Sequence, residues 1–264
     1  MFELAPHHKY GLSLKRPVMP ASGAMGYGDE YADLVDFSLL GAFVTNPVSL
    51  RPRKTAGGPR LRVHSDHFVV HTGLPNPGGK TGRSKDSKIW ERLPVPVIVH
   101  LVATTAEETM KAAVRLSHLR CVAGIELGLA DRLTPDQAVS LVHAAGEGDK
   151  PVIVRIPFSR VDDLAPLLSE EGVSALTLTA PPRAVLPPAA GMEDADPRFY
   201  RGRLYGPAVL PLLLGTLSRW VSKLPVPIIA CGGIQSAQEA LACLNLGATA
   251  VQIDAVLWRN PTLL

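Results

Sequence analysis

The stretch Pro96-Val-Ile-Val-His-Leu101, with the segment Ala106–Leu119 that follows it, shows the pattern that decides the fold. The first is a short run rich in β-branched residues, which is typical of a buried strand. The second has apolar residues at helical spacing. Seven further runs resemble the strand: Pro17–Ala21, Phe43–Thr45, Gly124–Leu127, Pro151–Arg155, Ala175–Thr179, Pro227–Ala230 and Ala250–Ile253. Eight buried strands alternating with helical segments predict an α/β fold, a single TIM-type (β/α)8 barrel.

The segments between these strands predict most of the helices and two long loops. Further helices are expected at Glu30–Leu40, Thr134–Ala145, Val161–Glu170, Leu210–Leu224 and Ser236–Leu246. The 264 residues match the roughly 250 of one barrel, so residues 1–264 are expected to form one domain. The connections from Asn46 to about Trp90 and from Thr179 to about Tyr205 are long. Both leave the carboxyl ends of strands, where barrel enzymes place their sites.

The end of the sequence is short for a barrel. Only Ala255–Leu264 follow the last strand, so the closing C-terminal helix is expected to be truncated. The apolar groove that this leaves would be covered by an N-terminal segment or by another subunit, which predicts a homo-oligomer or a partner protein.

The composition limits the environment and the ligands. The cysteines Cys121, Cys231 and Cys243 are odd in number and without paired spacing, which predicts a reducing, cytoplasmic location. Neither a secretory signal nor a run of about 20 apolar residues is found, so no membrane association is expected. The formal charge is +3, and basic residues cluster between Arg51 and Arg62. This cluster favours a small anionic ligand over nucleic acid.

Several stretches resemble one known family, in order along most of the chain. These are Pro17-Val-Met-Pro-Ala-Ser-Gly-Ala-Met-Gly-Tyr-Gly28, Leu39–Thr45 with Leu50–Arg53, Thr72-Gly-Leu-Pro-Asn-Pro-Gly78, Leu204-Tyr-Gly-Pro-Ala-Val-Leu-Pro211, Pro227-Ile-Ile-Ala-Cys-Gly-Gly-Ile234 and Gly247-Ala-Thr-Ala-Val-Gln252. The chain resembles the class 1 dihydroorotate dehydrogenases. That resemblance implies an FMN-binding barrel that oxidises dihydroorotate to orotate.

The resemblance also implies where a flavin and its substrate would lie. Small residues at the end of the first strand would let backbone approach a flat ring, although a tight turn explains them equally well. Backbone N–H groups after the seventh strand would cradle the phosphate. Asn76 is a retained substrate amide. The expected cofactor residues are Ala21, Ser22, Gly23, Asn46, Arg155, Gly206, Gly232, Gly233, Asp254 and Ala255.

Most of the reactive groups of the family are nevertheless replaced. The lysine after the second strand is Asn46, and the position of the catalytic base holds Asp131. An aspartate just before a helix that opens at Thr134-Pro135 is more often a cap or solvated. Four substrate amides are replaced, by Val70, Gly128, Leu133 and Ala180. These losses argue against dihydroorotate oxidation.

The phosphate end is altered as well, because Asp254-Ala255 stands where the family has Gly-Thr. A carboxylate about 4 Å from a phosphate would cost on the order of 4 kcal/mol at an effective dielectric near 20, or about a thousandfold in affinity. The penalty disappears if Asp254 turns away, or if Arg203 or Arg259 neutralises it.

New polar residues occupy the strand ends. His100, Glu126, Arg155, Cys231 and Asp254 could all reach the mouth of the barrel. With His100 as the titrating group, they could form a new acid–base site; alternatively, Glu126 and Arg155 form a structural pair. The histidines at 64, 67 and 71 lie in an expected hairpin rather than a helix, so no metal site is predicted.

Three functions remain open. The chain could be an FMN-dependent oxidoreductase acting on CH–CH groups, with a substrate other than dihydroorotate. It could be a non-catalytic barrel that serves as an assembly or regulatory subunit. It could also be a flavin-free enzyme in which His100, Asp131 and Arg155 act on an anionic substrate.

Overall fold

Eight parallel strands form one sheet in the computed structural model, which describes residues 1–78, 85–102, 104–187 and 199–263. The strands are β3 (Val18–Pro20), β4 (Phe43–Val44), β7 (Val97–Val102), β8 (Val122–Gly128), β9 (Val152–Pro157), β10 (Ala175–Ala180), β13 (Ile228–Cys231) and β14 (Ala250–Ile253). The sheet order is β3-β14-β13-β10-β9-β8-β7-β4. Between the end strands β3 and β4, the N–H of Gly41 donates to the carbonyl of Val18 at 2.7 Å. The sheet therefore nearly closes on itself, and the predicted TIM-type barrel is confirmed.

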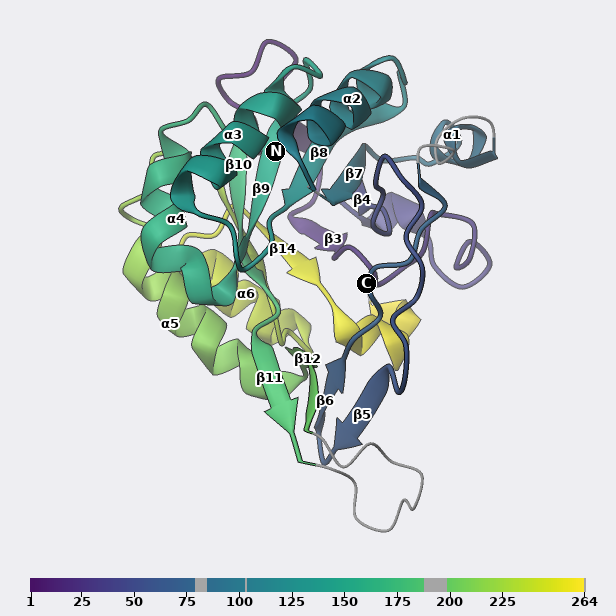
Figure 1. The fold of residues 1–264 in the computed structure, drawn as a ribbon, viewed down its shortest axis with the longest axis vertical. Helices are drawn as coiled ribbons and strands as arrows, with labels where there is room; N and C mark the ends of the chain where they lie inside the picture. The colour runs from purple at the N-terminus through teal and green to yellow at the C-terminus, as the bar shows by residue number, and fades with distance from the viewer. Residues whose placement is uncertain (79–84, 103, 188–198, 264) are drawn as a thin grey trace.

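Helices alternate with these strands and cover the outside of the barrel (Figure 1). They are α1 (Lys85–Trp90), α2 (Ala106–Ser117), α3 (Pro135–Gly146), α4 (Val161–Ser169), α5 (Leu210–Trp220) and α6 (Ala237–Asn245). Side chains of Thr105, Thr134 and Ser236 accept backbone N–H groups at the starts of α2, α3 and α6. Such caps satisfy donors that have no partner within the helix.

The helix expected at Glu30–Leu40 is wrong, because only a 3-10 turn forms there, η1 (Phe37–Leu39). The Glu30 carboxylate accepts the N–H groups of Tyr27 and Gly28, and the Asp36 side chain accepts the N–H of Ser38. These local bonds compete with the helical hydrogen bonds.

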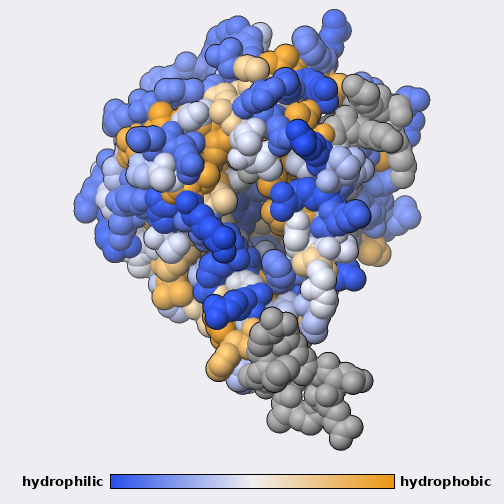
Figure 2. Space-filling view, in the orientation of Figure 1, coloured by the Kyte–Doolittle hydropathy of each residue, from blue (hydrophilic) through white to orange (hydrophobic). Residues whose placement is uncertain are grey.

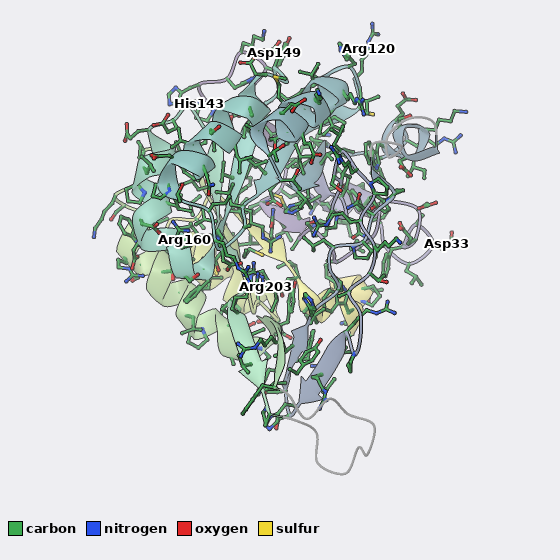
Figure 3. All side chains as sticks on the ribbon, viewed as in Figure 1. Asp33, Arg120, His143, Asp149, Arg160 and Arg203 are labelled. Atoms are coloured by element: carbon green, nitrogen blue, oxygen red, sulfur yellow. The ribbon has the colours of Figure 1, made fainter. Side chains whose placement is uncertain are left out.

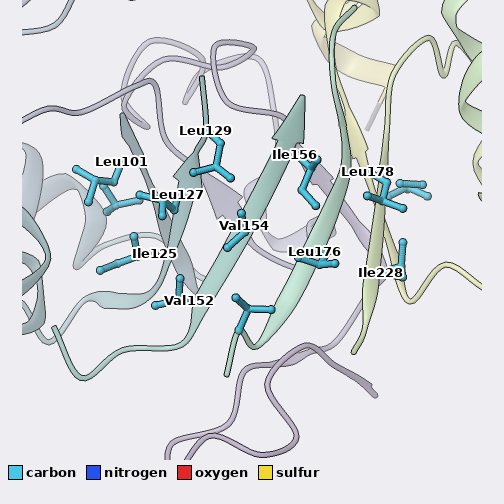
Figure 4. Close-up of a cluster of buried hydrophobic side chains, with 14 of the residues drawn as sticks. Leu101, Ile125, Leu127, Leu129, Val152, Val154, Ile156, Leu176, Leu178 and Ile228 are labelled. Carbon is cyan, nitrogen blue, oxygen red and sulfur yellow. The ribbon is translucent and has the colours of Figure 1, made fainter. Parts of the chain in front are cut away.

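The strands have a hydrophobic layer on each side, one facing the helices and one inside the barrel. Side chains that point outward, including Leu101, Leu127 and Val154, form one cluster with buried residues of the helices. Figure 4 shows these side chains on their strands. Side chains that point inward, including Met19, Ile98 and Ile153, form a second cluster with Leu4 and Leu14. Leu4 follows β1 (Phe2–Glu3), and Leu14 belongs to its antiparallel partner β2 (Ser13–Leu14). The N-terminal hairpin therefore contributes to the apolar interior, and the opposite end of the barrel is left for polar groups.

The two long connections meet in a four-stranded antiparallel sheet, here called the mouth sheet. It comprises β5 (Leu61–His64), β6 (His67–Val70), β11 (Arg183–Leu186) and β12 (Tyr200–Tyr205), in the order β11-β12-β6-β5. Figure 1 shows it projecting from one side of the barrel. The expected hairpin at His64–His71 is confirmed. His64 and His67 face each other across its turn with ring centroids 5.0 Å apart, whereas His71 lines a cavity between the mouth sheet and the barrel.

The segment after β14 forms two 3-10 turns, η5 (Ala255–Trp258) and η6 (Pro261–Leu263). Beside them lies a groove lined by Val18, Leu39, Ala240 and Leu263, among others. Its coverage by another subunit stays a prediction. No helix within the described ranges is long and apolar enough to cross a bilayer.

Candidate functional site

A polar layer lies inside the barrel, above the inward apolar layer. Side chains alternate along a strand, so residues two positions beyond the inward apolar ones also point inward. On six neighbouring strands these positions are buried and polar or sulfur-containing: His100, Glu126, Arg155, Thr177, Cys231 and Gln252. Ionisable side chains are almost never buried unless they are paired, so this layer identifies a candidate site.

Glu126 is the centre of this layer. One carboxylate oxygen lies 2.6 Å from His100 Nδ1, and the other accepts Thr177 Oγ1 at 2.9 Å and Gln252 Nε2 at 2.6 Å. Burial alone would raise the pKa of Glu126, but the hydrogen bond and charge of His100 and the charge of Arg155 lower it to about 2. Glu126 is therefore ionised, and His100 must donate Nδ1–H to it. In the neutral imidazole, Nε2 then carries the free lone pair.

Gly128 provides the space for His100. A Cβ added to this glycine would lie 2.6 Å from His100 Nε2. The sequence alone shows Gly128 as the loss of a substrate amide. In the structure, its missing side chain leaves room for the imidazole of His100 on the neighbouring strand.

Arg155 lies on the other side of Glu126. Its Nη1 is 3.9 Å from the carboxylate, and its Nη2 is 3.1 Å from Cys231 Sγ. Burial alone would lower the pKa of the Arg155 guanidinium, but the interactions with Cys231 and Glu126 raise it above its ordinary value. Burial raises the pKa of Cys231 to about 12, so the thiol stays protonated. The expected Glu126–Arg155 pair exists, but His100 makes the closer contact with Glu126.

A cavity of about 400 Å³ separates the polar layer from the mouth sheet, and we call it the mouth cavity. Figure 2 shows the molecule hollowed near the centre of this face. Its basic lining residues are Arg53, His71, His100, Arg155, Arg183 and Arg203. Among the described residues that line it, none is an aspartate or glutamate. The space is therefore suited to an anion.

Asp131 holds two of these arginines. Its carboxylate accepts Arg183 Nη2 at 2.9 Å and Arg203 Nη2 and Nη1 at 2.6 and 3.0 Å. Thr134, not Asp131, caps α3. Burial would raise the pKa of Asp131, but Arg203 and Arg183 lower it overall. A carboxylate held in this way is a poor proton acceptor, so the geometry favours a positioning role for Asp131 over the predicted role as a base. Arg160, labelled with Arg203 in Figure 3, donates to the backbone carbonyls of Asp131 and Leu133.

Asn76, expected to bind substrate, belongs instead to the loop before α1. Its Oδ1 accepts the Oγ–H of Ser49 at 3.0 Å and the N–H of Gly78 at 2.9 Å, and its Nδ2 donates to the carbonyl of Leu74. Asn76 is buried and does not line the mouth cavity. The geometry therefore favours a role for this amide in holding the loop over the predicted role in binding substrate.

Comparisons with known proteins place this chain in a family. The family model described as dihydroorotate dehydrogenase matches residues 6–135 and 188–264. The chain belongs to the dihydroorotate dehydrogenase family. It is 33% identical to the dihydroorotate dehydrogenase B (NAD(+)), catalytic subunit, of Geotalea uraniireducens, over 96% of this chain and 87% of that protein. Subunits of the same name from Pelobacter propionicus and Anoxybacillus flavithermus are 32% and 30% identical, over 96% and 95% of this chain and 87% and 84% of their own lengths. The unmatched residues 136–187 include Arg155 and Arg183.

One end of a dihydroorotate dehydrogenase-type flavin site fits the residues present. Ser22, Gly23, Asn46 and Arg155 line the mouth cavity, and Ala21 is buried next to them. A Cβ on Gly23 would meet nothing within 4 Å, so its backbone borders open space. Ser22 Oγ, Asn46 Oδ1 and Arg155 Nε are buried without a partner among the described residues. These atoms could serve a flat ring with polar edges.

The phosphate end does not fit. Gly206, Gly232, Gly233, Asp254 and Ala255 are all absent from the lining of the mouth cavity. Asp254 is buried, and its Oδ1 accepts the N–H of Ala255 at 2.7 Å. Arg203, a candidate to neutralise it, pairs with Asp131 instead. No chemical step through FMN is therefore derived for this chain.

Proposed function

We propose that this member of the dihydroorotate dehydrogenase family binds a small organic anion in the mouth cavity and acts on it by proton transfer through His100, without oxidising dihydroorotate. The observation that carries the proposal is the buried His100–Glu126 pair, 2.6 Å apart, at the floor of a cavity whose charged lining residues are basic.

The arginines support binding of an anion. Arg183 and Arg203 enter from the mouth sheet, and Arg53 enters from the loop after β4. Arg155 enters from β9 below and keeps a buried Nε without a partner among the described residues. Asp131 already accepts hydrogen bonds from Arg183 and Arg203, so these two contribute positive charge, and Arg53 and Arg155 are placed to meet a ligand carboxylate.

The His100–Glu126 pair supports acid–base chemistry. In the form of His100 that keeps Nδ1–H on Glu126 and has no proton on Nε2, Nε2 takes a proton from the ligand, and the electron pair of the broken bond stays on the ligand. Arg155 lines the same cavity as His100, so its positive charge stabilises the negative charge that develops on the ligand. Glu126 stabilises the imidazolium through Nδ1–H and returns no proton itself. The division of roles is that of a histidine base oriented by a buried carboxylate.

The same lining supports the absence of dihydroorotate oxidation. Val70, Gly128 and Ala180 line the mouth cavity where the family's substrate amides are expected. None of them offers a side-chain donor or acceptor. An orotate-type ligand would lose the hydrogen bonds that make its binding selective, which costs about 1–3 kcal/mol for each unpaired group.

A second candidate function, flavin-dependent oxidation of another CH–CH substrate, is favoured by the unpartnered atoms of Ser22 and Asn46 beside the open backbone of Gly23. An absorption spectrum of the purified protein distinguishes the two candidates. A flavin spectrum that a substrate bleaches supports this second function over the first.

The test uses dihydroorotate, orotate and a panel of small mono- and dicarboxylates. Calorimetry identifies the ligands that bind, and proton NMR in D2O then detects exchange of their C–H protons. We expect binding without flavin and exchange of at least one proton. Exchange should fall at least 100-fold in His100→Asn with binding retained, and it should be unchanged in His143→Asn, which alters a surface histidine paired with Glu171. Equal exchange in His100→Asn and the native protein would refute the role of His100.

A further inference from the structure

Three glycines with positive φ converge next to the ends of β12 and β13. They are Gly206 (φ 125°), Gly232 (φ 134°) and Gly233 (φ 74°). A Cβ on Gly233 would lie 2.4 Å from the nitrogen of Leu210 and 3.0 Å from the carbonyl oxygen of Gly206. Two loops thus pack backbone against backbone, and successive N–H groups in such turns can form a concave site for anions, here called the cradle.

The carboxylate of Asp254 already lies in this cradle. Its Oδ1 accepts the N–H of Ala255 at 2.7 Å, and the N–H of Gly233 also donates to the carboxylate. The residue is only 4% exposed. Burial raises the pKa of Asp254, and the two N–H groups with the charge of Arg155 oppose that rise. One donor of the cradle, the N–H of Gly233, is therefore used by a group of the chain itself.

The mouth cavity does not reach the cradle. Tyr205 and Trp258 line the cavity with ring centroids 5.2 Å apart. Trp258 Nε1 donates to the carbonyl of Gly23 at 3.1 Å. A ligand in the mouth cavity thus meets these rings, and no cradle residue is among the residues lining the cavity.

We infer that Asp254 is an internal substitute for a ligand phosphate. Its carboxylate occupies the backbone donors of Gly233 and Ala255, so the site accepts ring or carboxylate ligands but not a phosphate tail. The inference does not depend on proton transfer by His100.

The native protein provides the first test, with FMN and riboflavin as probes in fluorescence titrations. The two flavins differ only in the phosphate. We expect no preference for FMN. A native protein that binds FMN at least tenfold more tightly than riboflavin would overturn the inference.

The variant Asp254→Gly provides the second test. The substitution removes the carboxylate that accepts the N–H of Ala255 and leaves the backbone in place. Removing the carboxylate should increase affinity for FMN by roughly a thousandfold and leave riboflavin unchanged. Inorganic phosphate should then appear on Gly233 and Ala255 in crystals of the variant.

The variant Asp254→Asn separates charge from shape, because an amide oxygen can still accept the N–H of Ala255. We expect it to gain much less FMN affinity than Asp254→Gly. Equal gains for FMN and riboflavin, or a folded Asp254→Gly that binds neither FMN nor phosphate better than the native protein, would overturn the inference. Carboxylate binding in the mouth cavity, measured in parallel, should be the same in all three proteins, so a failure of the proposed function would be seen separately.

Discussion

Replacing Glu126 with glutamine should destabilise the protein by about 3 kcal/mol at pH 7. The amide that replaces the carboxylate has one acceptor oxygen for the donors of His100, Thr177 and Gln252, and it leaves the charge of Arg155 without its partner. Folding lowers the pKa of Glu126 from 4.5 to about 2. At about 1.4 kcal/mol per unit, this corresponds to about 3 kcal/mol. Breaking a buried ion pair typically costs about 3–5 kcal/mol, which agrees.

The pH dependence tests the same reasoning. The folded-state pKa is depressed, so the stabilisation is fully present above pH 4.5 and is lost as pH falls through about 2. Urea denaturation should show that the difference between the native protein and Glu126→Gln shrinks by about 2 kcal/mol from pH 7 to pH 3. The surface variant Glu171→Gln, which breaks the exposed pair with His143, should lose less than about 1 kcal/mol. A difference below 1 kcal/mol for Glu126→Gln at pH 7, or one independent of pH, would refute the buried charged network.

Two further substitutions test the space that Gly128 leaves for His100 and the pairing of Asp131 with Arg183 and Arg203, here called the Asp131 clamp. Gly128→Ala places a Cβ 2.6 Å from His100 Nε2, so it should lower the free energy of unfolding by about 1–3 kcal/mol and reduce proton exchange on the ligand; an unchanged urea midpoint would contradict the packing argument. Asp131→Asn removes the charge that holds Arg183 and Arg203, so backbone amides of β11 and β12 should exchange faster with D2O while those of β8 do not. Equal protection of the mouth sheet in both proteins would show that the clamp is not needed.

The barrel could be predicted from the sequence because its strands depend on local pattern. Each predicted run overlaps an observed strand, as Pro96–Leu101 overlaps β7 (Val97–Val102). Burial on both faces makes such strands continuously apolar, and the polar residue within one, as at His100, marks the inward site. Five predicted helices have observed counterparts for the same reason.

The mouth could not be predicted in the same way. The mouth sheet pairs Arg203 with Val70, and no pattern within either loop specifies that partner. β11 (Arg183–Leu186) has one arginine followed by three apolar residues, so its sequence shows no alternation that would predict a strand. Asp131 pairs with Arg183 and Arg203, which lie 52 and 72 residues away. Asn76 bonds its own loop and also Ser49, 27 residues away. Neighbouring residues in the sequence do not specify these distant partners.

The mouth sheet has a consequence for exchanging parts between relatives of this chain. Its two hairpins follow different barrel strands, yet each supplies the neighbour that satisfies the backbone of the other at β6 and β12. Grafting one hairpin alone from another family member would leave an exposed strand edge, which invites pairing between molecules. The segments β5–β6 and β11–β12 therefore act as one structural unit, and a new specificity has to be transferred with both segments together.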